Sequence, residues 1–268
     1  MSVASLPMYD LPEVAAATDA WWAGIARALR REGIEDVPDG LRRDRDLTRP
    51  WRAPDLLFSQ TCGYPLTHEF AGKLCVVSTP CFDCAGCEGP RYRSLLIVRE
   101  DDPAIGLGDL RGRIAAVNAP HSQSGYSALR ASVAPLARSG RFFSEIVMSG
   151  GHADSLALVA GGKADLCAVD CVTHALLARY RPAAVANLRA LGATVDAPGL
   201  PYVTRADASD ERLRRLHAGL FAALADPSVA AAREALLIAG AEVLPAAAYN
   251  RIVDIEDESR ARGYARLA

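Results

Sequence analysis

The chain has 268 residues, of which half are apolar and 23% are charged. This length and composition fit a soluble globular protein with one large domain or two medium ones. The formal net charge of −2 gives no basic surface for nucleic acid or anionic lipid. No apolar run reaches the length of a membrane span. We therefore expect no nucleic-acid partner and no membrane span, and any anion site must be local.

The N-terminus and the cysteines bear on the compartment. Residues 1–9 lack the basic and apolar regions of a signal peptide, so we expect the chain as written to be cytoplasmic or to have lost an export signal. Seven cysteines, an odd number, fit a reducing compartment better than a disulfide framework. Cys81, Cys84 and Cys87 have metal-ligand spacing, but no fourth ligand stands nearby in the sequence. We predict no metal and no other cofactor, with these three as weak candidates for a metal site or for disulfides.

Apolar patterns in the first part of the chain predict one long helix and several strands. Helical spacing indicates a helix over 12–31, and short apolar runs indicate strands at 55–60, 73–78 and 92–98. The loop at 80–91 contains the three closely spaced cysteines.

The middle of the chain, 113–180, alternates strand and helix three times. Strands are expected at 113–117, 145–148 and 164–169, which indicates a parallel sheet with helices on its faces. From Ser209 onward the pattern predicts helices only.

The segment at 118–126 carries the strongest functional signal. It joins a predicted strand to a predicted helix and is rich in small polar residues: Ser122, Gln123, Ser124 and Gly125. The first N–H groups of a helix have no internal partner and lie in positive potential, which favours an anion. Serine hydroxyls add donors, and glycine allows close approach to the backbone. The alternative interpretation is that a serine here merely caps the helix.

The pattern also predicts two α/β lobes. We expect lobe 1 to comprise residues 1–98 and 203–268, and lobe 2 to comprise residues 99–202. The chain then crosses between the lobes twice, near Val98 and Tyr202, and the crossing segments form a hinge. The cleft between two such lobes is the default ligand site.

Motifs in this order along the chain resemble those of one family. They lie at 60–64, 86–94, 109–113, 122–126, 151–152 and 162–170. Together they resemble the substrate-binding proteins of phosphate, phosphite and phosphonate ABC transporters. The resemblance implies the type 2 periplasmic-binding-protein fold, an α/β fold of two lobes. Each lobe is a mixed sheet flanked by helices, and a two-strand hinge joins them.

The resemblance also implies a set of ligand-binding residues. Residues 122–125 hold the phosphonate oxygens, and His152, at the start of the next helix, faces the same oxygens. Asp170 meets an amino substituent on the ligand. The remaining residues of the set come from the first lobe: Tyr9, Gln60, Thr61 and Tyr92. Two alternatives stay open, because His152 can be a surface or capping residue and Asp170 can cap the helix at Cys171.

The function implied is that of a monomeric solute-binding protein that captures a small oxyanion for an ABC transporter permease. No Gly-x-Ser-x-Gly elbow, Walker loop or His-Glu-x-x-His motif occurs, so we predict no enzymatic activity. Because the chain shows no export signal, a cytoplasmic enzyme and a ligand sensor on the same fold remain as alternatives.

Overall fold

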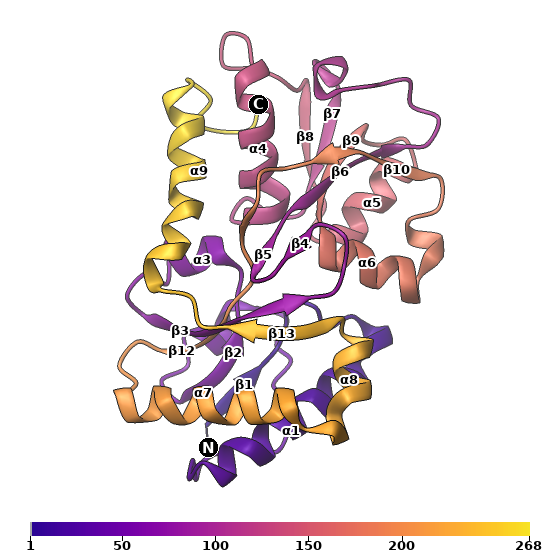
Figure 1. The fold of residues 1–268 in the computed structure, drawn as a ribbon. Helices are drawn as coiled ribbons and strands as arrows, with labels where there is room; N and C mark the ends of the chain where they lie inside the picture. The colour runs from indigo at the N-terminus through magenta and orange to yellow at the C-terminus, as the bar shows by residue number, and fades with distance from the viewer. Residues whose placement is uncertain (1) are drawn as a thin grey trace. The chain divides into compact units, whose positions relative to one another are not determined.

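The computed structural model describes residues 2–268 and divides the chain into two compact units. The first unit comprises Met1–Asp83 and Pro198–Ala248, and the second comprises Cys84–Ala197 and Tyr249–Ala268. Figure 1 labels the elements of both units. The chain therefore passes between the units three times rather than twice, and the boundaries differ from the expected 98/99 and 202/203.

The first unit is built on a five-stranded sheet in the order β1-β2-β12-β3-β13. β1 is parallel to β2, and the other pairs are antiparallel. Tyr202 in β12 pairs with Gln60 on one side and with Ser78 on the other, so segments far apart in the chain meet in this sheet. The strands are β1 Val3–Ser5, β2 Leu56–Gln60, β3 Leu74–Phe82, β12 Tyr202–Arg205 and β13 Ile238–Glu242.

Local sequence explains the helices of this unit. Trp21, Ile25 and Leu29 recur on one face of the longest helix and are at most 1% exposed. Ser209 caps α7, because its side chain accepts a hydrogen bond from the Arg212 amide. The helices are α1 Ala15–Arg31, α2 Thr48–Trp51, α3 Gly63–Thr67, α7 Asp210–Ala225 and α8 Ala230–Ala235.

β13 corrects the expectation that only helices follow Ser209. Its residues pair with the far end of β3, which continues to Phe82 and so includes part of the expected cysteine loop. A short apolar run is compatible with either helix or strand, and here the open edge of β3 decides the outcome.

The second unit contains another five-stranded sheet, in the order β10-β6-β9-β7-β8. β7 runs parallel to both β8 and β9, as the alternating pattern predicted, whereas β6 is antiparallel to β9 and β10. The strands are β6 Ser94–Arg99, β7 Ile114–Val117, β8 Glu145–Met148, β9 Leu166–Asp170 and β10 Leu188–Ala193. A small ribbon consists of β4 Cys87–Glu88, β5 Arg91–Tyr92 and β11 Ala197–Pro198. Because β6 pairs with β9, residues 94–98 belong to this unit and not to the first.

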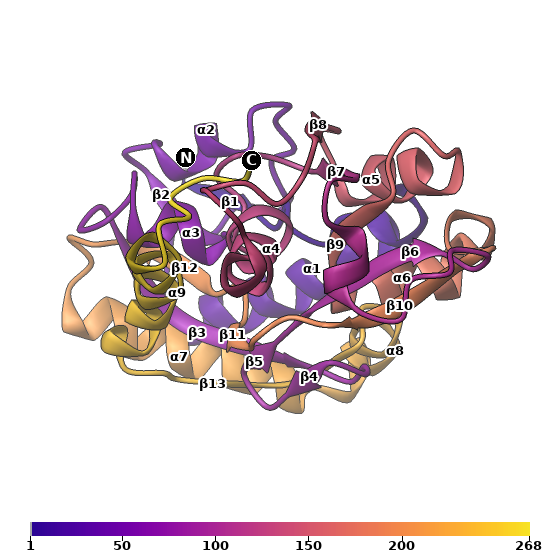
Figure 2. The ribbon, with the colours of Figure 1, turned by 90° about the horizontal axis from the view of Figure 1, so that it is seen from above.

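The helices of the second unit follow its strands, apart from one at the C-terminus. They are α4 Ala128–Val133, α5 His152–Ala160, α6 Cys171–Tyr180 and α9 Asn250–Ala261. A π-helical turn, Gln123–Ser127, leads directly into α4. α9 lies alongside α4 in both views (Figures 1 and 2).

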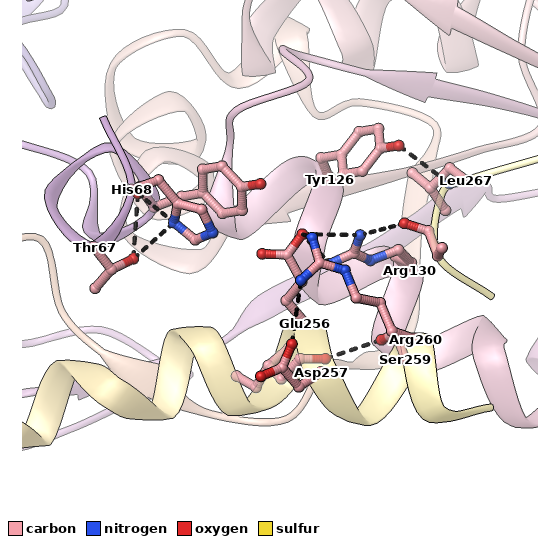
Figure 3. A network of polar contacts seen from close by, with 12 residues as sticks. Thr67, His68, Tyr126, Arg130, Glu256, Asp257, Ser259, Arg260 and Leu267 are labelled. Carbon is pink, nitrogen blue, oxygen red and sulfur yellow. Dashed lines mark hydrogen bonds and ion pairs between the residues drawn. The ribbon is translucent and has the colours of Figure 1, made fainter. Parts of the chain in front are cut away.

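A buried ion pair explains why α9 belongs to this unit and not to the first. The Arg130 and Glu256 side chains are 3% and 4% exposed, and their charged atoms lie 3.3 Å apart. Arg260 reaches the same carboxylate at 3.0 Å, as Figure 3 shows. Tyr264 and Leu267 are buried in the hydrophobic core of the unit. The assignment of the C-terminal residues to lobe 1 is therefore wrong, because their partners are 120 or more residues away and the helical pattern does not identify them.

No helix within residues 2–268 combines the length and the apolar character needed to cross a bilayer.

Candidate functional site

Three parallel strands of the second unit end at one edge of its sheet. β7 pairs with β8 and with β9 in parallel register, so their carboxyl ends point the same way. The segments that follow these strands begin the helical turn at Gln123, the helix at His152 and the helix at Cys171. Ligands of open α/β sheets gather outside the carboxyl ends of the strands. The sheet topology therefore brings the expected second-lobe residues to one edge.

The loop after β7 is held by a hydrogen-bonded chain of side chains. The Ser122 hydroxyl accepts a hydrogen bond from the Gly125 amide at 3.0 Å, so the capping interpretation of this serine is confirmed. Ser122 Oγ also lies 3.4 Å from Ser124 Oγ, which lies 2.9 Å from His152 Nε2. The two serines and the histidine thus form one continuous polar cluster, although His152 follows Ser124 by 28 positions.

Several buried polar atoms around this cluster have no hydrogen-bond partner among the described residues. Both amide atoms of Gln123, which is 1% exposed, are in this state. Asn118 Oδ1 and Ser127 Oγ also have no such partner. An unsatisfied buried polar group costs about 1–3 kcal/mol, and native proteins retain such groups chiefly where a ligand, ion or water completes them. The loop is thus suited to a polar ligand.

Gly125 has a steric reason to be glycine. A Cβ atom at this position would lie 2.0 Å from Asn118 Oδ1 and 3.3 Å from His152 Cε1. Any larger residue would push the Asn118 amide aside. Gly125 therefore allows Asn118 at the end of β7 to approach the same cluster as His152.

The environment of His152 favours its neutral form. Burial lowers its pKa to about 4, and the Ala168 carbonyl offsets only part of this effect. The imidazole is therefore uncharged at pH 7 and offers a neutral hydrogen-bonding group. A bound anion would favour the charged form and raise this pKa again.

Asp170 caps α6. Its Oδ1 accepts hydrogen bonds from the Val172 amide at 2.8 Å and from the Thr173 amide at 3.2 Å. The capping alternative is thus confirmed, and the residue is 2% exposed. This carboxylate accepts hydrogen bonds from free amides at the start of α6. It also adds negative charge at the same edge of the sheet.

Tyr92 and Ser94 also lie in the second unit, which corrects the assignment of Tyr92 to the first lobe. Tyr92 pairs with Cys87 in the small ribbon and is 4% exposed. Ser94 pairs with Asp170 across β6 and β9, and its buried hydroxyl has no hydrogen-bond partner among residues 2–268. Sequence reasoning missed Ser94 and Asn118 as site candidates. Ser94 begins β6 and Asn118 follows β7, both at the edge of the sheet where ligands gather. This position next to a predicted strand could have identified them from the sequence.

The expected residues of the first unit lie near one another. Tyr9 and Gln60 line a small cavity of about 20 Å³ with Trp21 and Tyr202. The Gln60 amide donates to the Leu200 carbonyl at 3.1 Å. Thr61 is fully buried, and its hydroxyl donates to the Cys62 carbonyl at 3.2 Å. Their role in ligand binding stays a prediction.

The cysteines are grouped differently from the expected triplet. Cys81 lies in β3, with its sulfur 3.9 Å from Glu242 Oε1. Among the described residues, the one group of three side chains with metal-ligand atoms close together is Cys84, Cys87 and Cys171. The sequence spacing identified two of these three and missed the third, because Cys171 follows 84 residues after Cys87.

One family model matches most of the chain. The profile of a family described as "ABC transporter, phosphonate, periplasmic substrate-binding protein" matches residues 55–249. A search of curated proteins found no match.

Solved structures of binding proteins share the fold over nearly the whole chain. A binding protein component of an ABC phosphonate transporter from Pseudomonas aeruginosa has a TM-score of 0.76 and 16% identity, covering 98% of this chain and 87% of its own. PhnD1 from Prochlorococcus marinus, in complex with methylphosphonate, has a TM-score of 0.71 and 14% identity, covering 97% and 98%. XAC2383 from Xanthomonas citri, bound to ATP, has a TM-score of 0.72 and 18% identity, covering 98% of each chain. At these identities the structural likeness shows the fold alone, which is that of the periplasmic binding proteins.

Proposed function

Because the chain belongs to the family of periplasmic substrate-binding proteins of phosphonate ABC transporters, we propose that its second unit binds the phosphonate group of a small ligand at the loop after β7. The ligand would then be passed to a transporter permease. The observation that carries this proposal is the polar cluster of Gln123, Ser124 and His152. Within it, both side-chain amide atoms of Gln123 lack a hydrogen-bond partner among the described residues.

The chemistry of the cluster suits an oxyanion. Hydroxyl and amide donors converge at the start of a helical run that continues through α4, where backbone N–H groups lack internal partners. A phosphonate presents three acceptor oxygens, and hydrogen bonds from neutral donors to a charged acceptor are stronger than those between neutral groups. The neutral His152 orients the Ser124 hydroxyl at 2.9 Å without bringing a permanent charge to the site.

The ligand class rests on the solved relatives. PhnD1 holds methylphosphonate, and XAC2383 holds ATP, which also carries tetrahedral phosphorus oxyanions. Methylphosphonate is therefore the first probe for this chain, and 2-aminoethylphosphonate tests whether Asp170 favours an amino substituent. Tyr9, Gln60, Thr61 and Tyr92 stay predicted contacts, and the proposal does not depend on them.

Calorimetry of the purified protein with methylphosphonate, 2-aminoethylphosphonate, phosphate and sulfate tests the proposal. Ser124→Ala removes a hydroxyl that would bond to the charged ligand, a loss of about 1.5–3 kcal/mol, or about 10- to 100-fold in affinity. Ser132→Ala is the matched control, because that hydroxyl bonds to the Ala128 carbonyl within α4. If none of the four oxyanions binds, the ligand class is wrong; if Ser124→Ala and Ser132→Ala bind equally well, the site is wrong.

A further inference from the structure

Three cysteine sulfurs meet in the second unit, at a place that the oxyanion site does not use. Cys84 Sγ and Cys87 Sγ lie 3.6 Å apart, and Cys87 Sγ and Cys171 Sγ lie 3.5 Å apart. All three sulfurs lie within 4.8 Å of one another. Two come from the loop that opens the unit, and the third is the first residue of α6.

The spacing of the sulfurs fits coordination of one ion. With metal–sulfur bonds of about 2.3 Å, two thiolates on a tetrahedral zinc ion lie about 3.8 Å apart. The Cys84–Cys87 and Cys87–Cys171 sulfur distances are within a few tenths of an ångström of that value. Three ligands at such distances leave a fourth position for solvent.

The loop is shaped around Cys171. The Cys87 amide donates to the Cys84 carbonyl at 3.1 Å, which closes a tight turn over Cys84-x-x-Cys87. Gly86 within this turn has φ of +101°, and a Cβ atom there would lie 2.8 Å from Cys171 Cβ. A residue other than glycine would therefore be strained and would also collide with Cys171. The turn at Cys84–Cys87 brings its two sulfurs close to Cys171, and glycine at position 86 permits this close approach.

Binding of a metal ion at this cluster would release protons. The ion would displace the thiol protons to solvent and bind the thiolates.

We propose that Cys84, Cys87 and Cys171 form a three-thiolate site for one thiophilic divalent cation of the zinc class, with solvent as the fourth ligand. The bound ion would link the loop at 84–87 to the start of α6. Cys171 is 1% exposed and the two loop cysteines are half-buried, so an ion can enter from the loop side.

The test uses the full chain, reduced and freed of metal, titrated with Co²⁺ and then with Zn²⁺. We expect thiolate-to-cobalt charge-transfer absorption that saturates at one ion per chain and disappears when Zn²⁺ is added. Cys87→Ser should weaken binding by more than about 100-fold, beyond the 10- to 100-fold loss typical of outer-shell partners. Cys81→Ser and Cys75→Ser, which change cysteines outside the cluster, should bind cobalt like the wild type.

A second measurement on the wild-type protein guards against a variant that fails to fold. Zn²⁺ should protect the thiols of Cys84, Cys87 and Cys171 from alkylation, as read by peptide mass spectrometry, and leave Cys75 reactive. The proposal is wrong if the reduced chain shows no charge-transfer band, or if Cys81→Ser abolishes the band. It is also wrong if the reduced chain binds no metal while air oxidation joins Cys84 to Cys87, because the cluster is then a redox pair.

Discussion

Three parallel strands of the second unit run into helical segments, and two of these junctions are capped by a polar side chain. After β7, the Ser122 hydroxyl accepts from the Gly125 amide. After β9, the Asp170 carboxylate accepts from the Val172 and Thr173 amides. The first cap is neutral, and unpartnered polar atoms of Gln123 and Asn118 surround it. The second cap is charged and is followed directly by the thiol of Cys171.

The difference between the two junctions lies in the charge of the capping side chain. A helix start attracts an anion only if no resident carboxylate already occupies it. The neutral Ser122 leaves that potential for a ligand, whereas Asp170 uses it internally. We therefore expect the junction after β7 to favour an external anion and the junction after β9 to favour a cation site beside it.

The largest expected effect comes from making the first junction like the second. Ser122→Asp keeps a capping oxygen but places a carboxylate beside the proposed phosphonate, and such like-charge contacts cost several kcal/mol. We expect calorimetry to show no methylphosphonate binding. Ser122→Asn is the matched control, because asparagine also caps a helix, is as large as aspartate and carries no charge. Equal binding by the two variants would contradict the comparison.

A smaller effect is expected from removing the charged cap. Asp170→Ala leaves two amides at the start of α6 without their acceptor and should lower the free energy of unfolding by about 0.5–2 kcal/mol. Asp170→Asn, which retains a capping oxygen, should lose less. Urea denaturation measures both variants. An equal loss in the two variants would mean that the charge itself, and not the cap, stabilises this junction.

A third expected effect concerns His152 and pH. Its pKa in the folded protein is about 4, below the ordinary value of 6.5, so the unfolded chain binds its proton more readily. Protonation of the unfolded chain at this histidine therefore lowers the free energy of unfolding. The loss is absent above pH 6.5 and grows as the pH falls toward 4.

Thermal unfolding across this pH range measures the effect. His152→Gln should flatten the decline in stability, and His121→Gln, at an exposed position of the same loop, should not. Parallel pH profiles for the wild type and His152→Gln would show that the histidine is not buried in neutral form.

Much of this protein follows from local pattern. The parallel strands β7, β8 and β9, the long helix α1 and the serine loop were predicted because helical and strand periodicity and the helix-start signal are properties of short segments. The expectation of a phosphonate transporter family was confirmed, because the family's motifs are also short and occur in order. The caps at Ser122 and Asp170 were foreseen as alternatives for the same reason.

Tertiary packing settled what short segments do not contain. Ser124 meets His152, and Cys87 meets Cys171, only because the sheet brings strand ends together across 28 and 84 positions. The open edge of β3 made a strand of 238–242, and the buried pair of Arg130 and Glu256 placed α9 in the second unit. Periodicity tells which face of a segment is buried, but the identity of the residue on the other side depends on the fold of the whole chain.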